Sequence, residues 1–243
     1  MNKDIKIFAL PFAGGSSFSY KDWKFSFGNI KLIPLDYSGH GKYFKGKLAD
    51  DFEELVKDVV EKILTFDIQT EEFCIYGHSL GGIVAYHTAL ILEEDYFLKP
   101  LCTMVGACYS PKDFANLGDY TQIDDKLKNN LVLQGRVSKT LVYTKEFEHF
   151  FYPAIKNDFK LVSKYYFQSM KLLQSDIDIF CGLFDSDIDI EAMKKWCQYS
   201  NSKSRIHIID GDHFFLESHS NDVCKIINSI IEQKIKLKRK KVD

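Results

Sequence analysis

Short apolar runs bounded by turn residues recur along most of the chain. Runs of about four to eight residues rich in Ile, Val, Leu, Phe and Tyr predict buried β-strands. The predicted strands are residues 5–10, 30–35, 73–76, 101–106, 177–182 and 205–209.

Between these runs the apolar positions recur with helical spacing. In residues 52–64 they fall every three or four positions, and Asp50 or Asp51 is a suitable N-cap. The other predicted helices are residues 80–92, residues 190–198 and a final helix from Asn221. Alternating strands and helices favour an α/β fold with a mostly parallel central sheet flanked by helices. At 243 residues, the chain is expected to form one such domain over residues 1–243.

The middle of the chain breaks this alternation. From residue 111 to residue 174 we find no strand-like run bounded by turns, and the aromatic and aliphatic residues of 147–166 follow helical spacing. Pro153 lies within that series, so we expect two helices or a kink there. We interpret residues 111–174 as a helical lid inserted in the domain. The alternative is that the apolar stripe of this segment simply packs on the sheet.

The strongest chemical signal is Gly-His-Ser-Leu-Gly at residues 77–81, between a predicted strand and a predicted helix. It matches the G-x-S-x-G nucleophile elbow, which holds a serine in a strained backbone conformation at a tight strand-to-helix turn. Side chains at Gly77 and Gly81 would collide across that turn. We therefore predict that Ser79 is a catalytic nucleophile, whereas the neighbouring His78 should point away from it.

A serine hydroxyl needs a base to take its proton, and on this fold the acid and the base follow the serine in chain order. His213 lies in the loop after the last predicted strand and is the predicted base. The acid is expected after the preceding strand, where Asp185 and Asp187 compete. We favour Asp185 because a glycine three residues earlier lets the loop turn, whereas Asp187 suits a helix cap.

The tetrahedral intermediate of acyl transfer also needs N–H donors for its oxyanion. One donor is expected from Leu80, the residue after the nucleophile, and the second from the loop after the first strand. In that loop Phe12 is the first choice and Ala13 the second. A phosphate-binding loop is the competing interpretation of the Gly-Gly pair there, but the lysine and the spacing that such a loop requires are missing.

Composition narrows the class of protein further. The chain is 45% hydrophobic and 27% charged, which is typical of a globular protein, and its net charge of −2 argues against a general nucleic-acid binder. We find no apolar run of the roughly 20 residues that a membrane helix needs, and no secretory signal. The six cysteines are scattered without a C-x-x-C pair, so we expect buried, reduced thiols, no metal site and a cytoplasmic protein.

Taken together, these motifs resemble the stand-alone (type II) thioesterases of nonribosomal peptide and polyketide synthesis. The resemblance rests on residues 10–15 (LPFAGG), 77–82 (GHSLGG), 151–159 (FYPAIKNDF) and 211–216 (GDHFFL). The chain departs from the family in the turn at residues 36–41, where Ser38 and His40 stand in place of a proline and an arginine.

The resemblance implies a monomeric α/β-hydrolase that removes acyl groups from the phosphopantetheine thiol of a carrier protein and has no cofactor of its own. An acidic carrier protein is the implied partner, and the lysines of the insertion that are candidates to receive it are Lys112, Lys126, Lys128 and Lys139. The same triad also suits an esterase or lipase for small esters, an acyltransferase or a cyclase. A docking protein without catalysis is the remaining alternative. Neither nucleic acid nor stable membrane association is expected.

Overall fold

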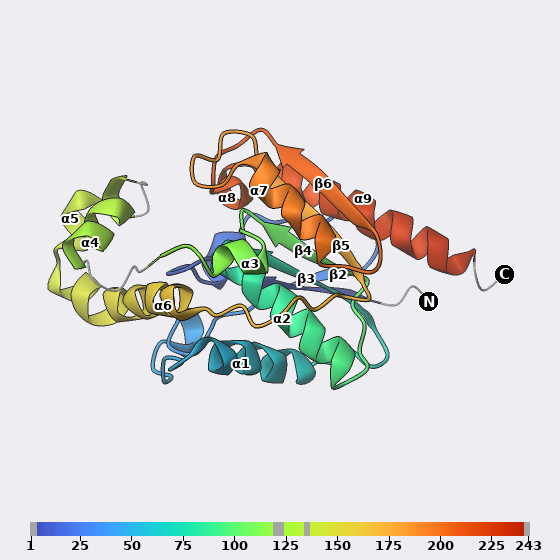
Figure 1. Cartoon of the computed structure of the whole chain (residues 1–243), viewed down its shortest axis with the longest axis horizontal. Helices are drawn as coiled ribbons and strands as arrows, with labels where there is room; N and C mark the ends of the chain where they lie inside the picture. Colours follow the sequence, from blue (N-terminus) through green and yellow to red (C-terminus); the bar gives the residue numbers. More distant parts are fainter. Residues whose placement is uncertain (1–3, 119–123, 134–136, 241–243) are drawn as a thin grey trace.

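A six-stranded parallel sheet in the order β2-β1-β3-β4-β5-β6 forms the centre of the protein (Figure 1). The computed structural model describes residues 4–118, 124–133 and 137–240. The strands are β1 (Ile5–Leu10), β2 (Ile30–Pro34), β3 (Glu72–His78), β4 (Cys102–Gly106), β5 (Asp176–Gly182) and β6 (Ser204–Ile209). The predicted α/β fold with a parallel sheet is therefore confirmed.

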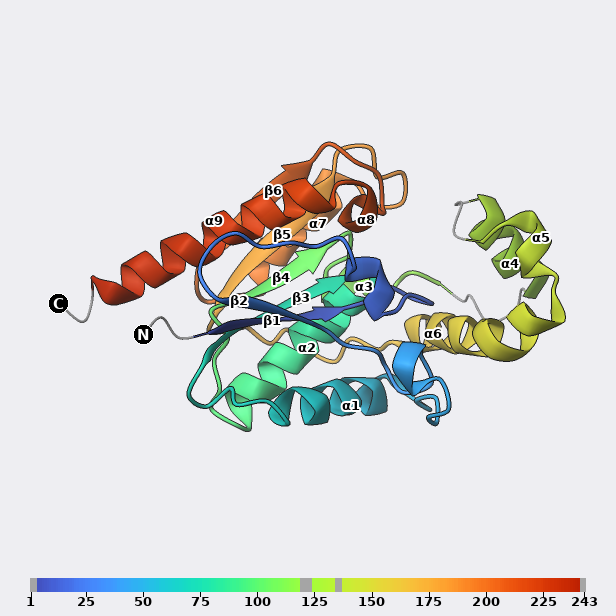
Figure 2. The ribbon, with the colours of Figure 1, turned by 180° about the vertical axis from the view of Figure 1, so that it is seen from behind.

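Helices cover both faces of this sheet (Figure 2). One layer contains α1 (Phe52–Leu64), α2 (Leu80–Glu94), α7 (Ile190–Lys194) and the 3₁₀ helix η4 (Lys195–Gln198). The other contains the 3₁₀ helix η1 (Ser17–Tyr20), α8 (Phe215–Ser218) and α9 (Ser220–Arg239). A third 3₁₀ helix, η2 (Gly41–Tyr43), follows β2.

Strand β1 shows how the sequence builds two cores. Successive side chains of a strand point to opposite faces, so Phe8 packs in the cluster with α1 and α2, whereas Ile7 and Ala9 pack in the cluster with α9. All six residues of β1 are buried. A central strand covered on both faces needs an apolar side chain at nearly every position, which is why the run reads as continuously hydrophobic.

Helix α1 begins where its capping residues predict. The Asp51 carboxylate accepts a hydrogen bond from the Glu54 N–H at 2.8 Å, and the Glu54 carboxylate accepts one from the Asp50 N–H at 2.6 Å. The first bond satisfies an N–H group that the first turn of a helix leaves without a partner, and the second ties the residue before the cap to that turn. Of the two candidate caps, Asp51 is therefore the one that the structure uses.

The regular elements that the structure describes between β4 and β5 are all helical, apart from an isolated bridge between Leu173 and Ser200. Its elements are α3 (Pro111–Phe114), α4 (Asp124–Leu133), α5 (Lys139–Val142), the π-helical turn η3 (Phe147–Phe151) and α6 (Tyr152–Lys164). Pro153 occupies the first turn of α6, so two helical pieces meet at this proline.

This inserted segment has a small hydrophobic cluster of its own, and α4 and α5 project beyond the carboxyl-terminal edge of the sheet (Figures 1 and 2). Phe147 and Ile155 are buried in that cluster, whereas Phe150 and Phe151 of the same stripe are 63% and 58% exposed. The stripe therefore does not simply pack on the sheet.

The remaining sequence expectations concern cysteines and membranes. All six cysteines are free, and five of them are buried; Cys197 is exposed. Among the described residues, no helix is both long enough and apolar enough to span a bilayer.

Candidate active site

Ser79 sits at a sharp turn between β3 and α2. Its φ of 53° and ψ of −119° lie outside the regions that residues with a side chain normally adopt. The elbow is tied to the neighbouring strand, because the Ser79 N–H donates to the Gly106 carbonyl at 2.8 Å. The strained serine of the predicted elbow is thus present in the structure, at the amino-terminal end of a helix.

The two glycines of the motif are required by close backbone contacts. A Cβ added at Gly77 would lie 1.8 Å from the Gly81 carbonyl oxygen. A Cβ added at Gly81 would lie 2.3 Å from the Leu10 carbonyl oxygen. Gly77 therefore allows the turn itself, whereas Gly81 allows the end of β1 to approach the first turn of α2.

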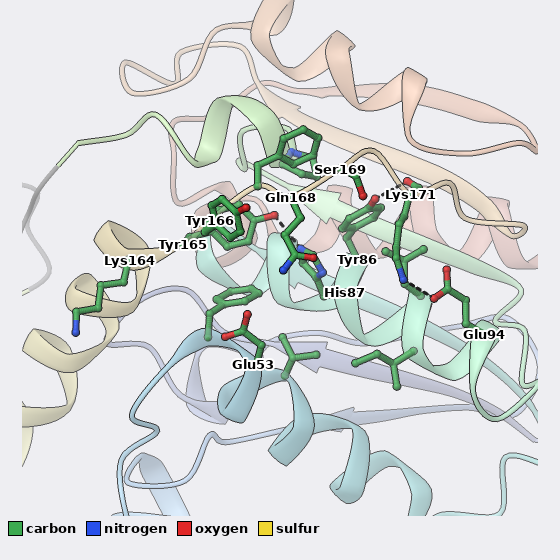
Figure 3. A pocket seen from close by; sticks show the side chains of 16 residues that line it. Glu53, Tyr86, His87, Glu94, Lys164, Tyr165, Tyr166, Gln168, Ser169 and Lys171 are labelled. Atoms are coloured by element: carbon green, nitrogen blue, oxygen red, sulfur yellow. Dashed lines mark hydrogen bonds and ion pairs between the residues drawn. The ribbon is translucent and has the colours of Figure 1, made fainter.

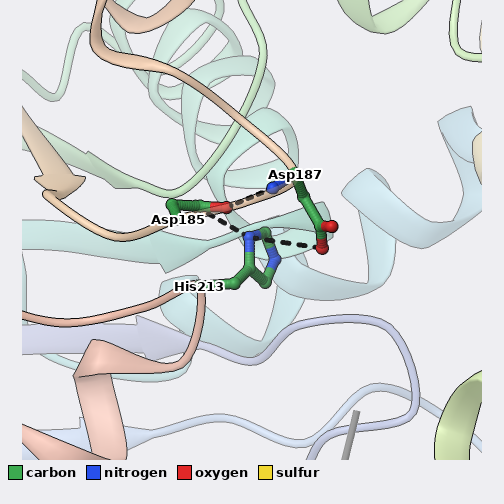
Figure 4. A group of neighbouring side chains, drawn as sticks. All are labelled: Asp185, Asp187 and His213. Carbon is green, nitrogen blue, oxygen red and sulfur yellow. Dashed lines mark hydrogen bonds and ion pairs between the residues drawn. The ribbon is translucent and has the colours of Figure 1, made fainter. Parts of the chain in front are cut away.

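His213 and Asp185 come together from the loops after β6 and β5 (Figure 4). His213 Nδ1 lies 2.9 Å from Asp185 Oδ2, and the Asp185 side chain is only 1% exposed. Asp187 Oδ2 lies 3.9 Å from the same nitrogen, and its side chain is 47% exposed. The carboxylate in hydrogen-bond contact with the imidazole is that of Asp185.

Backbone groups orient the Asp185 carboxylate. Its Oδ1 accepts hydrogen bonds from the N–H groups of Asp187 at 2.8 Å and Ile188 at 3.0 Å. Oδ2 is thereby directed at His213. A carboxylate can only accept, so Nδ1 carries the imidazole hydrogen and Nε2 holds the free lone pair of a neutral ring.

His78 connects the elbow with the loop of His213. It is fully buried, and its Nε2 lies 2.6 Å from the His213 carbonyl oxygen. A carbonyl only accepts, so Nε2 carries the hydrogen, and Nδ1 accepts from the Tyr76 hydroxyl at 3.1 Å. The sequence indicated that His78 points away from Ser79, but it held no signal for this contact across 135 positions.

The loop after β1 lies against the same end of α2. Its Gly15 N–H donates to the Phe12 carbonyl at 2.8 Å, and Gly14 has a φ of 74°, so the chain turns tightly there. The Phe12 ring contacts the rings of His78 and Phe214 edge-on, with centroids 6.3 Å and 5.4 Å away. Phe12 and Ala13, the two candidate donors, are both buried in this turn.

The predicted base and its two candidate acids are also the one grouping of three metal-ligating side chains among the described residues. Ligand atoms of Asp185, Asp187 and His213 lie within 4.8 Å of one another. Two of these side chains are already hydrogen-bonded to each other, which is the arrangement of an acid and a base.

A pocket of about 300 Å³ lies elsewhere, between α1, α2 and the segment that leaves α6 (Figure 3). His87 Nε2 faces the Tyr165 hydroxyl at 2.8 Å, and Lys171 pairs with Glu94 at 2.6 Å. Burial, with a smaller contribution from the Lys171 charge, lowers the pKa of His87 to about 4. None of the predicted triad residues lines this pocket.

The candidate lysines of the insertion differ in their surroundings. Lys112 and Lys139 are exposed. Lys128 is engaged within the insertion, where it forms an ion pair with Glu148 and lies 4.7 Å from the centre of the Tyr152 ring. The side chain of Lys126 lies outside the described part of the structure.

A parallel sheet covered on both faces, a strained serine after β3 and a histidine–aspartate pair beyond β5 and β6 define an α/β-hydrolase. Residues 5–231 match the family model of the thioesterase domain, and the chain belongs to this family. It is therefore a hydrolase of the thioesterase family.

The chain is also similar to individual thioesterases over nearly its whole length. It is 28% identical over 224 residues to the medium-chain S-acyl fatty acid synthase thioesterase of Rattus norvegicus, covering 90% of this chain and 84% of the relative. It is 24% identical over 230 residues to thioesterase PikA5 of Streptomyces venezuelae, covering 93% of this chain and 81% of that relative.

A solved structure shows the same fold. The crystal structure of ClbQ from the colibactin NRPS/PKS pathway superposes with a TM-score of 0.82 at 28% identity, covering 96% of this chain and 99% of ClbQ. The resemblance to thioesterases of nonribosomal peptide and polyketide synthesis is thereby confirmed.

Proposed function

We propose that the protein hydrolyses acyl thioesters on the phosphopantetheine arm of carrier proteins and so frees synthetase modules that hold stalled or wrongly loaded chains. The observation that carries the proposal is a strained Ser79 at the head of α2, together with the His213–Asp185 pair. The membership of the thioesterase family and the similarity to ClbQ support the thioester as the bond that is cleaved.

The proposed reaction begins with Ser79 Oγ attacking the thioester carbonyl while His213 Nε2 takes the serine proton. Asp185 holds the imidazole in the required tautomer and stabilises the imidazolium. The N–H of Leu80 and the N–H of Phe12, with Ala13 as the alternative, receive the oxyanion. The pantetheine sulfur then leaves with the proton from His213, which yields an acyl-serine.

The second half of the reaction returns the enzyme to its starting state. His213 takes a proton from water, the resulting hydroxide attacks the acyl-serine carbonyl, and the free acid leaves as Ser79 regains its proton. Every group in this route is a side chain or a backbone N–H of the chain itself, so no cofactor enters the proposal.

Loss of Ser79 tests the proposal. Release of acid from an acyl-loaded carrier protein should fall by more than about a thousandfold in Ser79→Ala, because removing the nucleophile leaves only binding and the oxyanion donors. Ser229→Ala on α9 is the matched control and should release acid at the wild-type rate. Undiminished release by Ser79→Ala would contradict the assignment.

The substrate class needs its own comparison. Wild-type protein is given an acyl-carrier protein, the same acyl group on free pantetheine, and a small ester of the same acid. The proposal predicts the highest kcat/KM for the carrier-bound thioester. Preference for the small ester would instead identify an esterase, and transfer of the acyl group to an added amine or alcohol in place of water would identify an acyltransferase or a cyclase.

A further inference from the structure

Helix α6 carries a fully buried carboxylate that faces two loops at the carboxyl-terminal edge of the sheet. Asp158 Oδ2 accepts a hydrogen bond from the Gly14 N–H at 2.7 Å and lies 3.0 Å from His40 Nε2. The Asp158 side chain is 0% exposed, and its Oδ1 has no hydrogen-bond partner among the residues that the structure describes. Burying a carboxylate costs free energy unless its charge is compensated. The position of α6 against these loops therefore depends on the groups that pair with Asp158.

The geometry of His40 shows how that charge is compensated. His40 is 5% exposed, and its Nδ1 lies 3.1 Å from the Ser38 carbonyl oxygen. Both ring nitrogens therefore face oxygen atoms, whereas a neutral imidazole has a single N–H. The His40–Asp158 pair is fully hydrogen-bonded only when it holds one proton more than a neutral histidine beside a carboxylate.

The groups that surround His40 favour this extra proton. Burial by itself lowers the pKa of His40, but the charge and hydrogen bond of Asp158, the Ser38 carbonyl and the more distant charge of Asp36 outweigh it. The net effect is a pKa of His40 above the ordinary value of 6.5. The Tyr37 ring meets His40 edge-on at 5.7 Å between centroids, and burial raises the pKa of Tyr37 so that it stays neutral.

The other partner of Asp158 belongs to the loop of the predicted oxyanion donors. Gly14 directly follows Phe12 and Ala13. A Cβ added at Gly14 would lie 2.7 Å from Ile155 Cγ1, so the loop also contacts the preceding turn of α6. The loop is therefore held against α6 at two points, through Ile155 by packing and through Asp158 by a charged hydrogen bond.

We propose that Asp158 is a positioning residue that holds the oxyanion loop through Gly14, and that it does so only while His40 carries the proton they share. The proposal rests on the function proposed above, because it assigns the loop to the oxyanion. When that proton is lost, the positive charge that compensates the buried Asp158 carboxylate disappears, and the single remaining N–H of His40 can serve either Asp158 or the Ser38 carbonyl but not both. The contact that holds α6 against the loop is thereby weakened. Catalysis should consequently decline on the alkaline side.

The test measures the rate at which a fluorophosphonate labels Ser79 between pH 5 and pH 10, by intact-protein mass spectrometry. This probe needs the nucleophile and the oxyanion donors but no thioester. We expect the wild-type rate to fall about tenfold on the alkaline side, with a midpoint above 6.5. His40→Gln and Asp158→Asn should lose the alkaline decline, because neither has the titrating pair.

Three further variants complete the test. Asn157→Ala removes the neighbouring bond from α6 to the Ala49 carbonyl, 3.0 Å long, and should keep the wild-type pH profile. Asp158→Ala should label about ten- to a hundredfold more slowly at every pH, because it holds neither Gly14 nor His40. His40→Arg keeps its charge throughout this pH range and should abolish the decline while retaining the wild-type maximum.

An independent readout is the NMR titration of the His40 ring, which should shift to lower pH in Asp158→Asn. An unchanged alkaline decline in His40→Gln and Asp158→Asn, or its absence in the wild type, would overturn the inference. So would an identical His40 titration in the wild type and Asp158→Asn. Failure of the wild type to be labelled at Ser79 at any pH would instead refute the proposed nucleophile.

Discussion

At the residue scale, the chemistry depends on which aspartate contacts His213. The two candidates lie two positions apart, yet only Asp185 has a buried side chain within hydrogen-bond distance of the imidazole. Chain order could predict that an acid follows β5. The glycine three residues earlier favoured Asp185, and the burial and distances of the two side chains in the structure agree with that choice.

Asparagine substitution separates the two aspartates. Asp185→Asn should lower kcat on a pantetheine thioester by about a thousandfold or more, because the amide favours the wrong imidazole tautomer and no longer stabilises the imidazolium. Asp187→Asn should change kcat by less than about threefold, since its exposed carboxylate makes no hydrogen bond to His213. A larger loss in Asp187→Asn than in Asp185→Asn would reverse the assignment.

A second prediction at this scale concerns the close contact of Gly81. In Gly81→Ala the new Cβ would meet the Leu10 and Pro11 carbonyls at 2.3 and 2.7 Å, so β1 and α2 must separate. The free energy of unfolding should fall by more than about 2 kcal/mol in urea denaturation.

The matched control for Gly81 is Gly28→Ala. Unlike at Gly81, a Cβ added at Gly28 would have no atom within 4 Å. Its positive φ of 59° alone should cost about 1–2 kcal/mol. If Gly28→Ala were the more damaging of the two, steric contact at the elbow would not be the reason for Gly81.

At the element scale, α2 forms both the elbow and one wall of the pocket in Figure 3. The existence and length of α2 could be predicted because apolar side chains recur along it. The first four predicted strands and the first two predicted helices lie within two residues of their observed bounds. Helices α3 to α6 could be predicted only as a helical region. Their individual bounds depend on packing within a small separate cluster rather than on a long periodic pattern.

The pocket beside α2 predicts a pH dependence of stability. The pKa of His87 is about 4 in the folded protein and near 6.5 when unfolded, so the unfolded chain binds the proton more tightly. Stability from neutral His87 is complete above pH 6.5 and declines as the pH falls toward 4. The loss should be about 2–3 kcal/mol.

Urea denaturation at pH 7 and at pH 4.5 checks this expectation. His87→Gln cannot titrate and should lose less stability between the two values than the wild type does. His149→Gln is the control, because this exposed histidine of the insertion should leave the wild-type pH dependence unchanged. Equal acid sensitivity of the wild type and His87→Gln would exclude His87 as the source.

At the scale of the whole molecule, the carboxyl-terminal edge of the sheet brings the elbow, the acid and base loops and α6 together (Figures 1 and 2). A carrier protein that delivers its arm to Ser79 must approach this edge. Lys112 and Lys139 are exposed on α3 and α5, so charge reversal at both positions probes the approach.

We expect Lys112→Glu/Lys139→Glu to raise KM for an acidic acyl-carrier protein about three- to tenfold, with kcat unchanged, since rim charges act mainly on encounter. KM for the same acyl group on free pantetheine should stay constant, and added salt should reduce the difference. Lys225→Glu on α9 is the control and should match the wild type. An equal rise in KM for both substrates would place the effect on acyl binding rather than on docking.

The sequence by itself determined the alternation of strands and helices, the glycines of the elbow and the order of serine, acid and base. Each of these depends on side-chain spacing within a few residues or on the order of the loops. Only the tertiary structure decided that Asp185 is the acid in hydrogen-bond contact with the imidazole, that His78 contacts the backbone carbonyl of His213, and that Asp158 meets His40 across 118 positions. Such contacts depend on how whole helices and loops pack against one another, and that packing cannot be predicted from a local sequence pattern.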